Sequence, residues 1–338
     1  MLSGILTASI RRSLPTAPMH AFSAPTAGSG KSMLVDLISL IASGREVGVI
    51  SQGKTEEELE KRLGALLLAG DQVIGIDNCE APLGGEFLCS MLTQQLVRAR
   101  ILGASKAPEL PTNAFVTATG NNLVLVGDLT RRAVLSRLDP KQERPELLQF
   151  KTKPIDLVKT DRGRYLVAAL TILRAYHMAG RPRQADPLGS FEDWSNWVRG
   201  ALLWLGCADP VDTIEGSRDM DPKLDALTAV VTQWNVAIGE DSVTARDVIT
   251  RATEQRIMIG QGSHGFSRAE YVHPDFREAL LAVAGEGGTI NSKRLGKWLS
   301  GNQDRILQDL RLVRGGYSAG IMRWRLERVS TTKEEEAP

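Results

Sequence analysis

The fold of this chain is decided by the stretch Ala24-Pro25-Thr26-Ala27-Gly28-Ser29-Gly30-Lys31-Ser32-Met33. It fits the pattern G-x-x-x-x-G-K-[ST], except that Pro25 takes the place of the first glycine. The glycines allow backbone N–H groups to curve around phosphate oxygens, and a helix that follows adds its dipole. Lys31 would reach the β- and γ-phosphates, while the Ser32 hydroxyl would hold Mg²⁺. Residues 25–33 are therefore predicted to form a phosphate-binding loop, or P-loop, for ATP and Mg²⁺.

The flanks of this loop give it the expected setting. His20-Ala21-Phe22-Ser23 reads as a short buried strand, and residues 33–41 have helical apolar spacing. A strand, a glycine-rich loop and a helix form the context that a phosphate site requires. The alternative, an ordinary flexible Gly/Ser loop, does not account for these flanks.

The bulk composition limits what else the chain can be. It has 338 residues, enough for two or three domains, with 41 Lys and Arg against 40 Asp and Glu. Because the charge is nearly balanced, any nucleic-acid surface must be local. Cys79, Cys89 and Cys207 form no CxxC pair, which disfavours a disulfide framework and a zinc site. No apolar run is long enough to span a membrane, so we expect a cytoplasmic protein.

Apolar strands alternate with helices over the first 150 residues. A short amphipathic helix is expected over residues 2–13. The expected strands are Met19–Ser23, Val47–Ser51, Val73–Asp77, Asn113–Thr119 and a fifth at either Leu135–Leu138 or Leu147–Phe150. This alternation predicts an α/β fold, a parallel sheet with helices on both faces. Further helices are expected at Tyr165–Ala179, Phe191–Gly206, Leu224–Ile238 and Ser242–Ile257, and Gly260–Gly265 reads as a connector.

A second candidate for the ATP site is the strand Val73-Ile74-Gly75-Ile76-Asp77, which has the form of a Walker B strand. A carboxylate at the end of this strand can lie beside the P-loop and hold Mg²⁺, so Ser32 and Asp77 are the expected metal-binding residues. A buried strand that ends in a turn-forming Asp-Asn pair is the plainer interpretation.

The residue that would activate the attacking water is left open by the sequence. Asn78 occupies the place where many ATPases carry a glutamate. The nearest carboxylate is Glu80, and a second cluster is Glu56-Glu57-Glu58, which also fits an exposed helix start. Another strand ends in Gly120-Asn121-Asn122, where the Asn121 amide would contact the γ-phosphate or simply cap a turn.

Arginines follow this asparagine strand. Arg131 and Arg132 come first, and Arg137 precedes Leu138-Asp139. In ring ATPases such arginines point into the neighbouring subunit's nucleotide and stabilise charge as the γ-phosphate leaves. The order of the motifs favours this role for Arg132, whereas surface arginines on a helix are also common.

The order of Lys31-Ser32, Asp77, Asn121 and Arg131-Arg132, followed by a helical region, resembles that of AAA+ ATPases. More narrowly, the chain resembles the helicase module of phage- and plasmid-type primase–helicase proteins. Phe191-Glu192-Asp193-Trp194 and Trp197-Val198-Arg199 add to this resemblance, which covers about residues 2–330. It implies an ATP-hydrolysing homo-oligomer, most often a hexameric ring, that acts on single-stranded or forked DNA. We expect the chain either to work beside a separate primase or to be part of a longer primase–helicase. Arg199 would be a lid arginine or a solvent-facing residue.

With this resemblance, the expected domains are a P-loop ATPase core (1–155), a helical lid or connector (156–260), a winged-helix-like DNA-binding domain (270–330) and a disordered tail (331–338). Asp275–Ala284, a helix that starts near Ser292, a third helix over Asp304–Leu312, a Gly315-Gly316 turn and a last strand over Met322–Val329 suggest the winged helix.

The C-terminal segment carries a local excess of basic residues. Between Tyr271 and Ser330, ten basic residues minus six acidic residues give a charge of +4. Such an excess supplies phosphate contacts, although a solvated helix face or a protein contact would look the same. The expected DNA-binding residues are Lys293, Arg294, Lys297, Arg314 and Arg323. A second basic stretch, Arg98, Arg100 and Lys106, fits either a loop that tracks a DNA strand or an ordinary surface loop.

Two functions fit these patterns best. The first is an ATP-driven DNA helicase or translocase in the replication of a phage or mobile element. The second is a DNA-binding initiator or loader that ATP switches while it is hydrolysed slowly, a role that Asn78 favours. A small-molecule kinase or a protein remodeller fits less well, because the sequence offers no substrate pocket and a remodeller needs no basic C-terminal segment.

Overall fold

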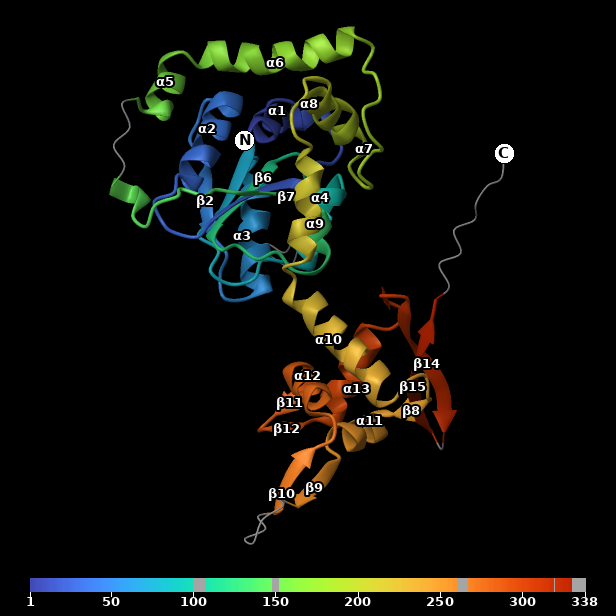
Figure 1. The fold of residues 1–338 in the computed structure, drawn as a ribbon. Helices are drawn as coiled ribbons and strands as arrows, with labels where there is room; N and C mark the ends of the chain where they lie inside the picture. The colour runs from blue at the N-terminus through green and yellow to red at the C-terminus, as the bar shows by residue number, and fades with distance from the viewer. Residues whose placement is uncertain (100–106, 148–151, 260–266, 319, 330–338) are drawn as a thin grey trace. The chain divides into compact units, whose positions relative to one another are not determined.

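A five-stranded parallel sheet forms the centre of the first half of the chain (Figure 1). Its strand order is β2-β3-β6-β1-β7, so β6 lies between the P-loop strand β1 and the Asp77 strand β3. The bounds of these strands are β1 (Met19–Ala24), β2 (Gly48–Ser51), β3 (Val73–Asp77), β6 (Phe115–Asn121) and β7 (Ala133–Arg137). The predicted α/β class and its parallel sheet are confirmed. The fifth strand is the earlier of the two alternatives, since Leu147 belongs to a 3₁₀ turn.

The computed structural model describes residues 1–99, 107–147, 152–259, 267–318 and 320–329. It divides into two units, unit 1 (Met1–Asp221) and unit 2 (Pro222–Pro338). This division falls inside the stretch 156–260 that the sequence analysis treats as one helical region. The expected connector Gly260–Gly265, the tail 331–338 and the basic residues Arg100 and Lys106 lie outside the described residues.

Helices cover both faces of the sheet because its strands are buried on both sides. On one face, Phe22, Val73 and Phe115 pack with Val35 and Ile38 of α2. The alternate residues of the same strands point to the opposite face of the sheet, where they pack in a second and larger hydrophobic core. The elements that surround the sheet strands are α1 (Leu2–Ile10), η1 (Arg11–Ser13), α2 (Lys31–Ser43), α3 (Glu56–Ala69), α4 (Glu86–Thr93), β4 (Leu96–Arg98), β5 (Glu109–Pro111), η2 (Gly127–Arg131) and η3 (Pro145–Leu147).

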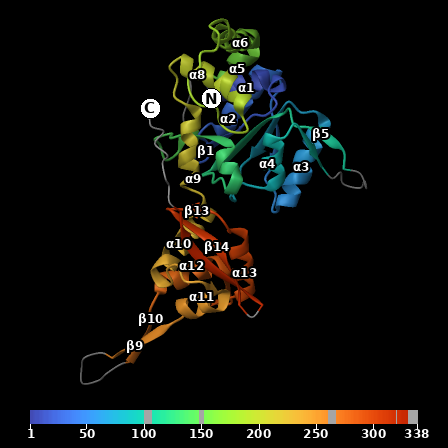
Figure 2. The same ribbon diagram turned by 90° about the vertical axis from the view of Figure 1, so that its right-hand side faces the viewer.

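A helical region completes unit 1 (Figure 2). It consists of α5 (Pro154–Thr160), α6 (Arg162–Met178), α7 (Glu192–Trp194), the π-helical turn η4 (Ser195–Arg199), α8 (Gly200–Trp204), η5 (Pro210–Asp212) and α9 (Thr213–Arg218). Arg162, at the start of α6, donates to the carbonyls of Leu40, Ile41 and Ala42 at 2.9–3.1 Å. A cation here complements the negative end of the α2 dipole, so α6 is fixed against the P-loop helix.

Unit 2 has its own core, built around Trp234, Phe276 and Trp324. Its helices are α10 (Pro222–Ala237), α11 (Ala245–Ala252), α12 (Pro274–Ala284) and α13 (Ser292–Gly301). Its strands are β8 (Val243–Thr244), β9 (Gln255–Ile259), β10 (Ser267–Tyr271), β11 (Gly285–Glu286), β12 (Thr289–Ile290), β13 (Ile306–Leu307), β14 (Leu310–Ser318) and β15 (Ile321–Arg328). One sheet has the order β13-β14-β15-β8, and β9 and β10 form a separate hairpin.

Three expectations for unit 2 were wrong. The helix predicted over Ser242–Ile257 is shorter, because β8 precedes it and β9 follows it. The stretch Asp304–Leu312 is not a helix but enters a sheet, since Asp304, Gln308 and Asp309 have φ angles of 64°, 46° and 67°, outside the right-handed helical region. Gly315-Gly316 does not form the hairpin turn either. Instead, the register of β14 shifts between Arg314 and Tyr317, as at a β-bulge.

Buried polar bonds hold α1 against the base of the first sheet. The Ser3 hydroxyl and His20 Nε2 are 2.8 Å apart, and Trp194 Nε1 donates to Thr7 Oγ1 at 2.9 Å. Arg11 donates to the carbonyls of Leu14 and Thr112, both at 2.6 Å, and to that of Ala114 at 3.1 Å. Burial lowers the pKa of Arg11 to about 10 and that of His20 to about 3. His20 is therefore neutral in the folded protein at neutral pH.

His20 makes stability depend on pH with a defined sign. Its pKa in the folded protein is about 3, below the ordinary 6.5, so the unfolded chain binds one proton more between these values. We expect the free energy of unfolding to fall by about 1.4 kcal/mol for each pH unit as pH drops through this window. The measurement is urea unfolding at several pH values, for the wild type and His20→Gln.

Since the carboxylates titrate in both proteins, the informative quantity is the difference between the two unfolding free energies. This difference should shrink in acid. The exposed His177→Gln variant is the matched control and should follow the wild type. A difference between wild type and His20→Gln that does not change with pH would contradict the buried, neutral imidazole.

Candidate functional site

The loop between β1 and α2 has the backbone geometry that the sequence predicts for it. Gly28 and Gly30 have φ angles of 72° and 84°, a left-handed conformation that glycine adopts without strain. The first helical bond after the loop runs from Leu34 N to Gly30 O at 3.1 Å. The N–H groups of the residues before Leu34 form the start of α2, where backbone donors are available to an anion. The loop therefore fits a phosphate group.

Lys31 is the first residue of α2, and its side chain reaches back to this loop. Its ammonium donates to Asn121 Oδ1 at 2.8 Å and to the Thr26 carbonyl at 3.0 Å. Asn121 is the last residue of β6, and its neighbour in the register is Ala24 at the end of β1. Burial lowers the pKa of Lys31, and the charge of Asp77 acts in the opposite direction. Lys31 and Asn121, 90 residues apart, are thus brought into contact by the pairing of β1 with β6.

Ser32 and Asp77 also lie together, as the metal-site prediction requires. The Ser32 hydroxyl donates to Asp77 Oδ1 at 3.2 Å. A serine hydroxyl beside a carboxylate is an oxygen donor set that suits Mg²⁺, which usually keeps several waters and takes further ligands from phosphates. The residues present therefore fit the cation, and Ser32 and Asp77 are the side chains that would hold it.

Thr119 is a residue of this site that the sequence analysis did not select. Its hydroxyl donates to Asp77 Oδ1 at 2.6 Å and accepts the backbone N–H of Asn78 at 3.1 Å. Thr119 is buried, with 4% of its surface exposed. One hydroxyl thus orients both the carboxylate and the turn after β3. The available signal was the position of a threonine two residues before Asn121, at the end of an otherwise apolar strand.

The two candidates for the water-activating base are placed differently. Glu80 is exposed, and its Oε1 accepts a hydrogen bond from Asn78 Nδ2 at 3.1 Å. Asn78 has a φ of 52°, so the chain turns sharply where β3 ends. In contrast, Glu56 accepts the backbone N–H of Glu86, and Glu58 accepts that of Lys54. The Glu56–Glu58 cluster therefore serves the first turn of α3 and the start of α4.

The arginines after β6 are largely used within their own chain. Arg132 Nη1 donates to the Cys89 carbonyl at 2.5 Å and to Thr93 Oγ1 at 3.0 Å, and its Nη2 pairs with Asp128. Only 13% of the Arg132 side chain is exposed, and within its own chain Arg132 anchors the end of α4; its expected role in a neighbouring subunit stays a prediction. Arg137 contacts Gly216 and Met220. Arg131 pairs with Asp128 but is 41% exposed.

The helical region also uses an arginine internally. Arg199 forms an ion pair with Asp209, with an Nη2–Oδ2 distance of 2.6 Å, and only 11% of its side chain is exposed. It therefore does not face solvent freely.

The basic residues of unit 2 fall into two groups. Arg323 donates to the Ser242 carbonyl at 2.6 Å, and Arg294 pairs with Glu286 at 3.1 Å, so both serve the fold of unit 2. Lys293, Lys297 and Arg314 are exposed and take part in none of the ion pairs found among the described residues. Lys293 and Lys297 are four residues apart on α13 and thus share one face. Among the five expected DNA-binding residues, these two lysines and Arg314 are exposed and outside the ion pairs that the described residues form.

The stretch around the second basic loop is only partly described. Arg98 of β4 pairs with Glu109 of β5, with an Nη2–Oε1 distance of 2.8 Å. The two side chains of this pair are 73% and 54% exposed, so Arg98 has a carboxylate partner but remains accessible.

The role of the Thr119 hydroxyl can be tested through the metal. We expect Thr119→Val to raise the Mg²⁺ concentration for half-maximal nucleotide hydrolysis about 10-fold or more, because loss of a residue that orients a metal ligand has this effect. Thr119→Ser, which keeps the hydroxyl, should restore most of the Mg²⁺ affinity. The measurement is ATPase rate against Mg²⁺ concentration.

Thr117→Val is the matched control for this experiment. Thr117 lies on the same strand, is fully buried and donates to the Ile74 carbonyl at 3.2 Å, away from Asp77. It should lose similar stability in thermal unfolding while its Mg²⁺ dependence stays that of the wild type. An unchanged Mg²⁺ dependence in folded Thr119→Val would refute the positioning role.

Comparison with known proteins gives little further guidance. No protein-family model and no curated protein matches this chain. Among solved structures, the chain is similar to the A form apo structure of the NrS-1 C-terminal region, with a TM-score of 0.38 and 15% identity over 79% of this chain and 70% of that one. A second A form structure of the same region gives the same TM-score with 12% identity, over 79% and 69%. Among the described residues, no helix is long and apolar enough to cross a membrane.

Proposed function

We propose that unit 1 is an ATPase of the AAA+ type and that the cluster of Lys31, Ser32, Asp77 and Asn121 is its active site. The observation that carries this proposal is that Lys31 and Ser32, at the start of the helix after β1, form hydrogen bonds to Asn121 and Asp77, which end the neighbouring strands β6 and β3. Ligands bind at this carboxyl edge in open α/β sheets. A structural polar cluster would not need a glycine-rich loop at the start of a helix.

Each side chain has a role in this proposal. The backbone of residues 25–33 cradles the phosphates, and Lys31 exchanges its contact with Asn121 for the β- and γ-phosphates. Ser32 and Asp77 hold Mg²⁺, which supplies charge stabilisation at the phosphate oxygens. Asn121, released from Lys31, is placed to orient the γ-phosphate or the attacking water.

Glu80 is the proposed water-activating residue. It is exposed at the same edge of the sheet, and the Asn78 amide holds its carboxylate at 3.1 Å. The Asn78–Glu80 pair would then replace the single glutamate that many ATPases carry. Glu56 is less suited to this role because its carboxylate is bound to the backbone of Glu86.

We further propose that the activity is directed at DNA, as a helicase or translocase in the replication of a phage or mobile element. The exposed Lys293–Lys297 face of α13 and Arg314 support a DNA contact by unit 2, which we interpret as a winged-helix variant. Arg131, more exposed than Arg132, is the arginine that a neighbouring subunit would meet in a ring. The alternative is an ATP-switched initiator or loader, which the absent glutamate at Asn78 favours. DNA-stimulated hydrolysis separates the motor from the switch.

Two variants separate nucleotide binding from hydrolysis. We expect Lys31→Ala to lose both, because it removes the cation from the phosphate site, and to lower the hydrolysis rate about 100-fold or more. Glu80→Gln should still bind ATP but hydrolyse it at least about 10-fold more slowly, since only proton acceptance is lost. The measurements are fluorescent-nucleotide binding and phosphate release, with and without single-stranded DNA.

Lys159→Ala and Glu56→Gln are the matched controls for these variants. Lys159 pairs with Glu46 and lies outside the cluster. Both controls should hydrolyse ATP at the wild-type rate. An active Lys31→Ala protein would reject the proposed active site, whereas loss of activity in Glu56→Gln rather than Glu80→Gln would move the base to Glu56.

The DNA proposal can be tested separately, through salt dependence. Lys293→Ala/Lys297→Ala removes two phosphate contacts, so log Kd should depend less steeply on log salt, with the slope reduced by about 1.4 to 1.8. Fluorescence anisotropy with labelled DNA at several salt concentrations measures this slope. Arg328→Ala removes an exposed cation of β15 that pairs with Glu240 at 3.1 Å, and as the control outside α13 it should reduce the slope by less than the double variant does. An unchanged slope in the double variant would remove α13 from the DNA-binding surface.

A further inference from the structure

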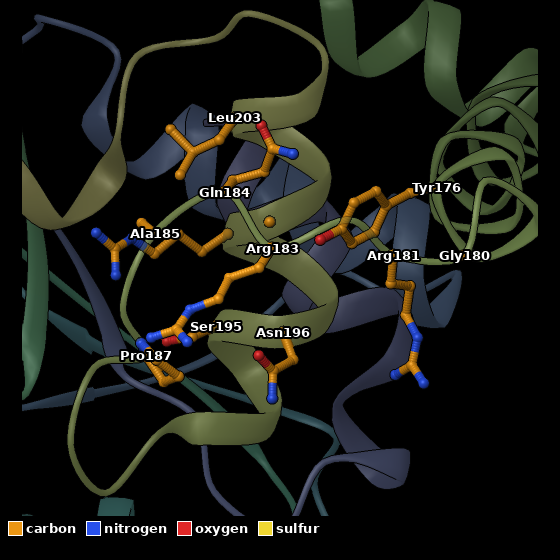
Figure 3. Close-up of a pocket in the computed structure, with 12 residues that line it drawn as sticks. Tyr176, Gly180, Arg181, Arg183, Gln184, Ala185, Pro187, Ser195, Asn196 and Leu203 are labelled. Carbon is orange, nitrogen blue, oxygen red and sulfur yellow. The ribbon is translucent and has the colours of Figure 1, made fainter.

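A cavity of about 400 Å³ lies in the helical region of unit 1 (Figure 3). It is formed by the end of α6, the loop that follows α6, and the consecutive helical turns η4 and α8. Its lining contains none of the P-loop residues, and neither Asp77 nor Asn121. The side chains that give it its chemistry are Tyr176, Arg181, Arg183, Gln184, Asn196 and Arg199. These side chains carry three guanidinium groups and no carboxylate.

One of the three arginines is a fixed part of the wall. Arg199 donates to both carboxylate oxygens of Asp209 and, through Nη1, to the Asp186 carbonyl at 2.6 Å. Burial tends to raise the pKa of Asp209, but hydrogen bonds from Arg199 and from the Val211 N–H prevail and lower it. Arg199 and Asp209 therefore neutralise each other. The charge available to a ligand comes from the other two arginines.

Arg181 is held in place without a carboxylate. Its guanidinium lies over the Trp197 ring, 4.5 Å from the ring centroid, and Trp197 stacks in turn on His177 at 5.3 Å. An arginine on an aromatic face keeps its N–H donors free for a second partner. Arg181 has a φ of 52°, in the left-handed region. Glycine adopts this conformation without strain, whereas for a residue with a side chain it raises the conformational free energy by about 1–2 kcal/mol. This φ belongs to the turn that ends α6, where the Arg181 N–H donates to the Tyr176 carbonyl at 3.0 Å.

Arg183 supplies the second cation. Figure 3 shows its side chain extending across the cavity toward Ser195. Among the described residues it pairs with Asp186, and the two side chains of this ion pair are 72% and 90% exposed. Because exposed pairs of this kind are weak, a ligand with a higher charge density would compete for Arg183. The Asn196 side chain is exposed beside it.

We propose that this cavity binds a phosphate ester, presented either by a nucleic acid strand or by a nucleotide, with Arg183 and Arg181 as the cations that attract it. The planar guanidinium groups match phosphate oxygens in pairs, and the Gln184 and Asn196 amides add neutral donors. A volume of about 400 Å³ lies within the range of small-molecule sites. The site is separate from the P-loop, so it does not depend on the proposed ATP hydrolysis.

The test uses the full chain with Lys31→Ala, which removes the P-loop lysine as a competing contact. Calorimetric titration with deoxythymidine 3′,5′-bisphosphate, adenosine monophosphate and inorganic phosphate distinguishes the sources of the ligand. Tightest binding of the bisphosphate indicates a nucleic acid strand, and tightest binding of the monophosphate indicates a nucleotide. Equal affinities show that only the phosphate group is recognised. Each of these three results supports the proposed site, provided that the binding affinity depends on Arg181 and Arg183.

That dependence is measured with Arg181→Ala/Arg183→Ala, which should weaken binding about 10-fold or more, as expected for lost charge-assisted hydrogen bonds. Arg164→Ala/Arg174→Ala removes the same charge from exposed positions of α6 outside the cavity, and should change the affinity less than twofold. If the double variant does not fold, Arg183→Ala alone is the test, because this side chain is exposed and its loss should leave the fold intact while weakening binding. Absence of binding, equal loss in the control, or equal competition by poly-glutamate would each overturn the proposal.

Discussion

The position of β6 between β1 and β3 is the constraint on which the candidate site depends. Because these strands are parallel and adjacent, their carboxyl ends meet at one edge of the sheet. Lys31 follows β1, Asp77 ends β3, and Asn121 ends the strand between them. Thr119, two residues before Asn121, then reaches Asp77 at 2.6 Å. The pairing of β1 with β6 places Asn121 within hydrogen-bond distance of Lys31, and the pairing of β6 with β3 places Thr119 beside Asp77.

Most of the arginines that matter to this fold act as internal donors. Arg11 fixes the base of the first sheet, Arg162 the end of α2, and Arg132 the end of α4. Each arginine donates hydrogen bonds to backbone carbonyls. At the ends of helices and in loops, these carbonyls would otherwise lack a hydrogen-bond partner. A count of positive charges therefore overstates the surface available to DNA. In unit 2, Arg323 bonds to the Ser242 carbonyl and Arg294 pairs with Glu286, which leaves Lys293, Lys297 and Arg314 as the expected residues outside the ion pairs of the described chain.

Much of the first unit could be predicted from the sequence. The strands around Phe22, Ile74 and Val116 are short apolar runs between helices, and such runs rarely form anything but a covered parallel sheet. The glycine-rich loop predicts a phosphate site because few other functions require that spacing. Prediction failed over Asp304–Leu312, where apolar spacing fits a helix but three left-handed residues turn the chain into a sheet. Short apolar runs do not distinguish these outcomes.

The sequence by itself determined the α/β class, the P-loop and the candidates Lys31, Ser32, Asp77 and Asn121, because these follow from local pattern and spacing. Only the tertiary structure decided which partners each candidate has: that Thr119 orients Asp77, that Asn78 holds Glu80, and that Arg132 is buried against α4. It also brought Arg181 over Trp197 to form a second basic cavity. Such contacts join residues through strand order and helix packing, and one sequence without its fold does not specify which polar groups meet.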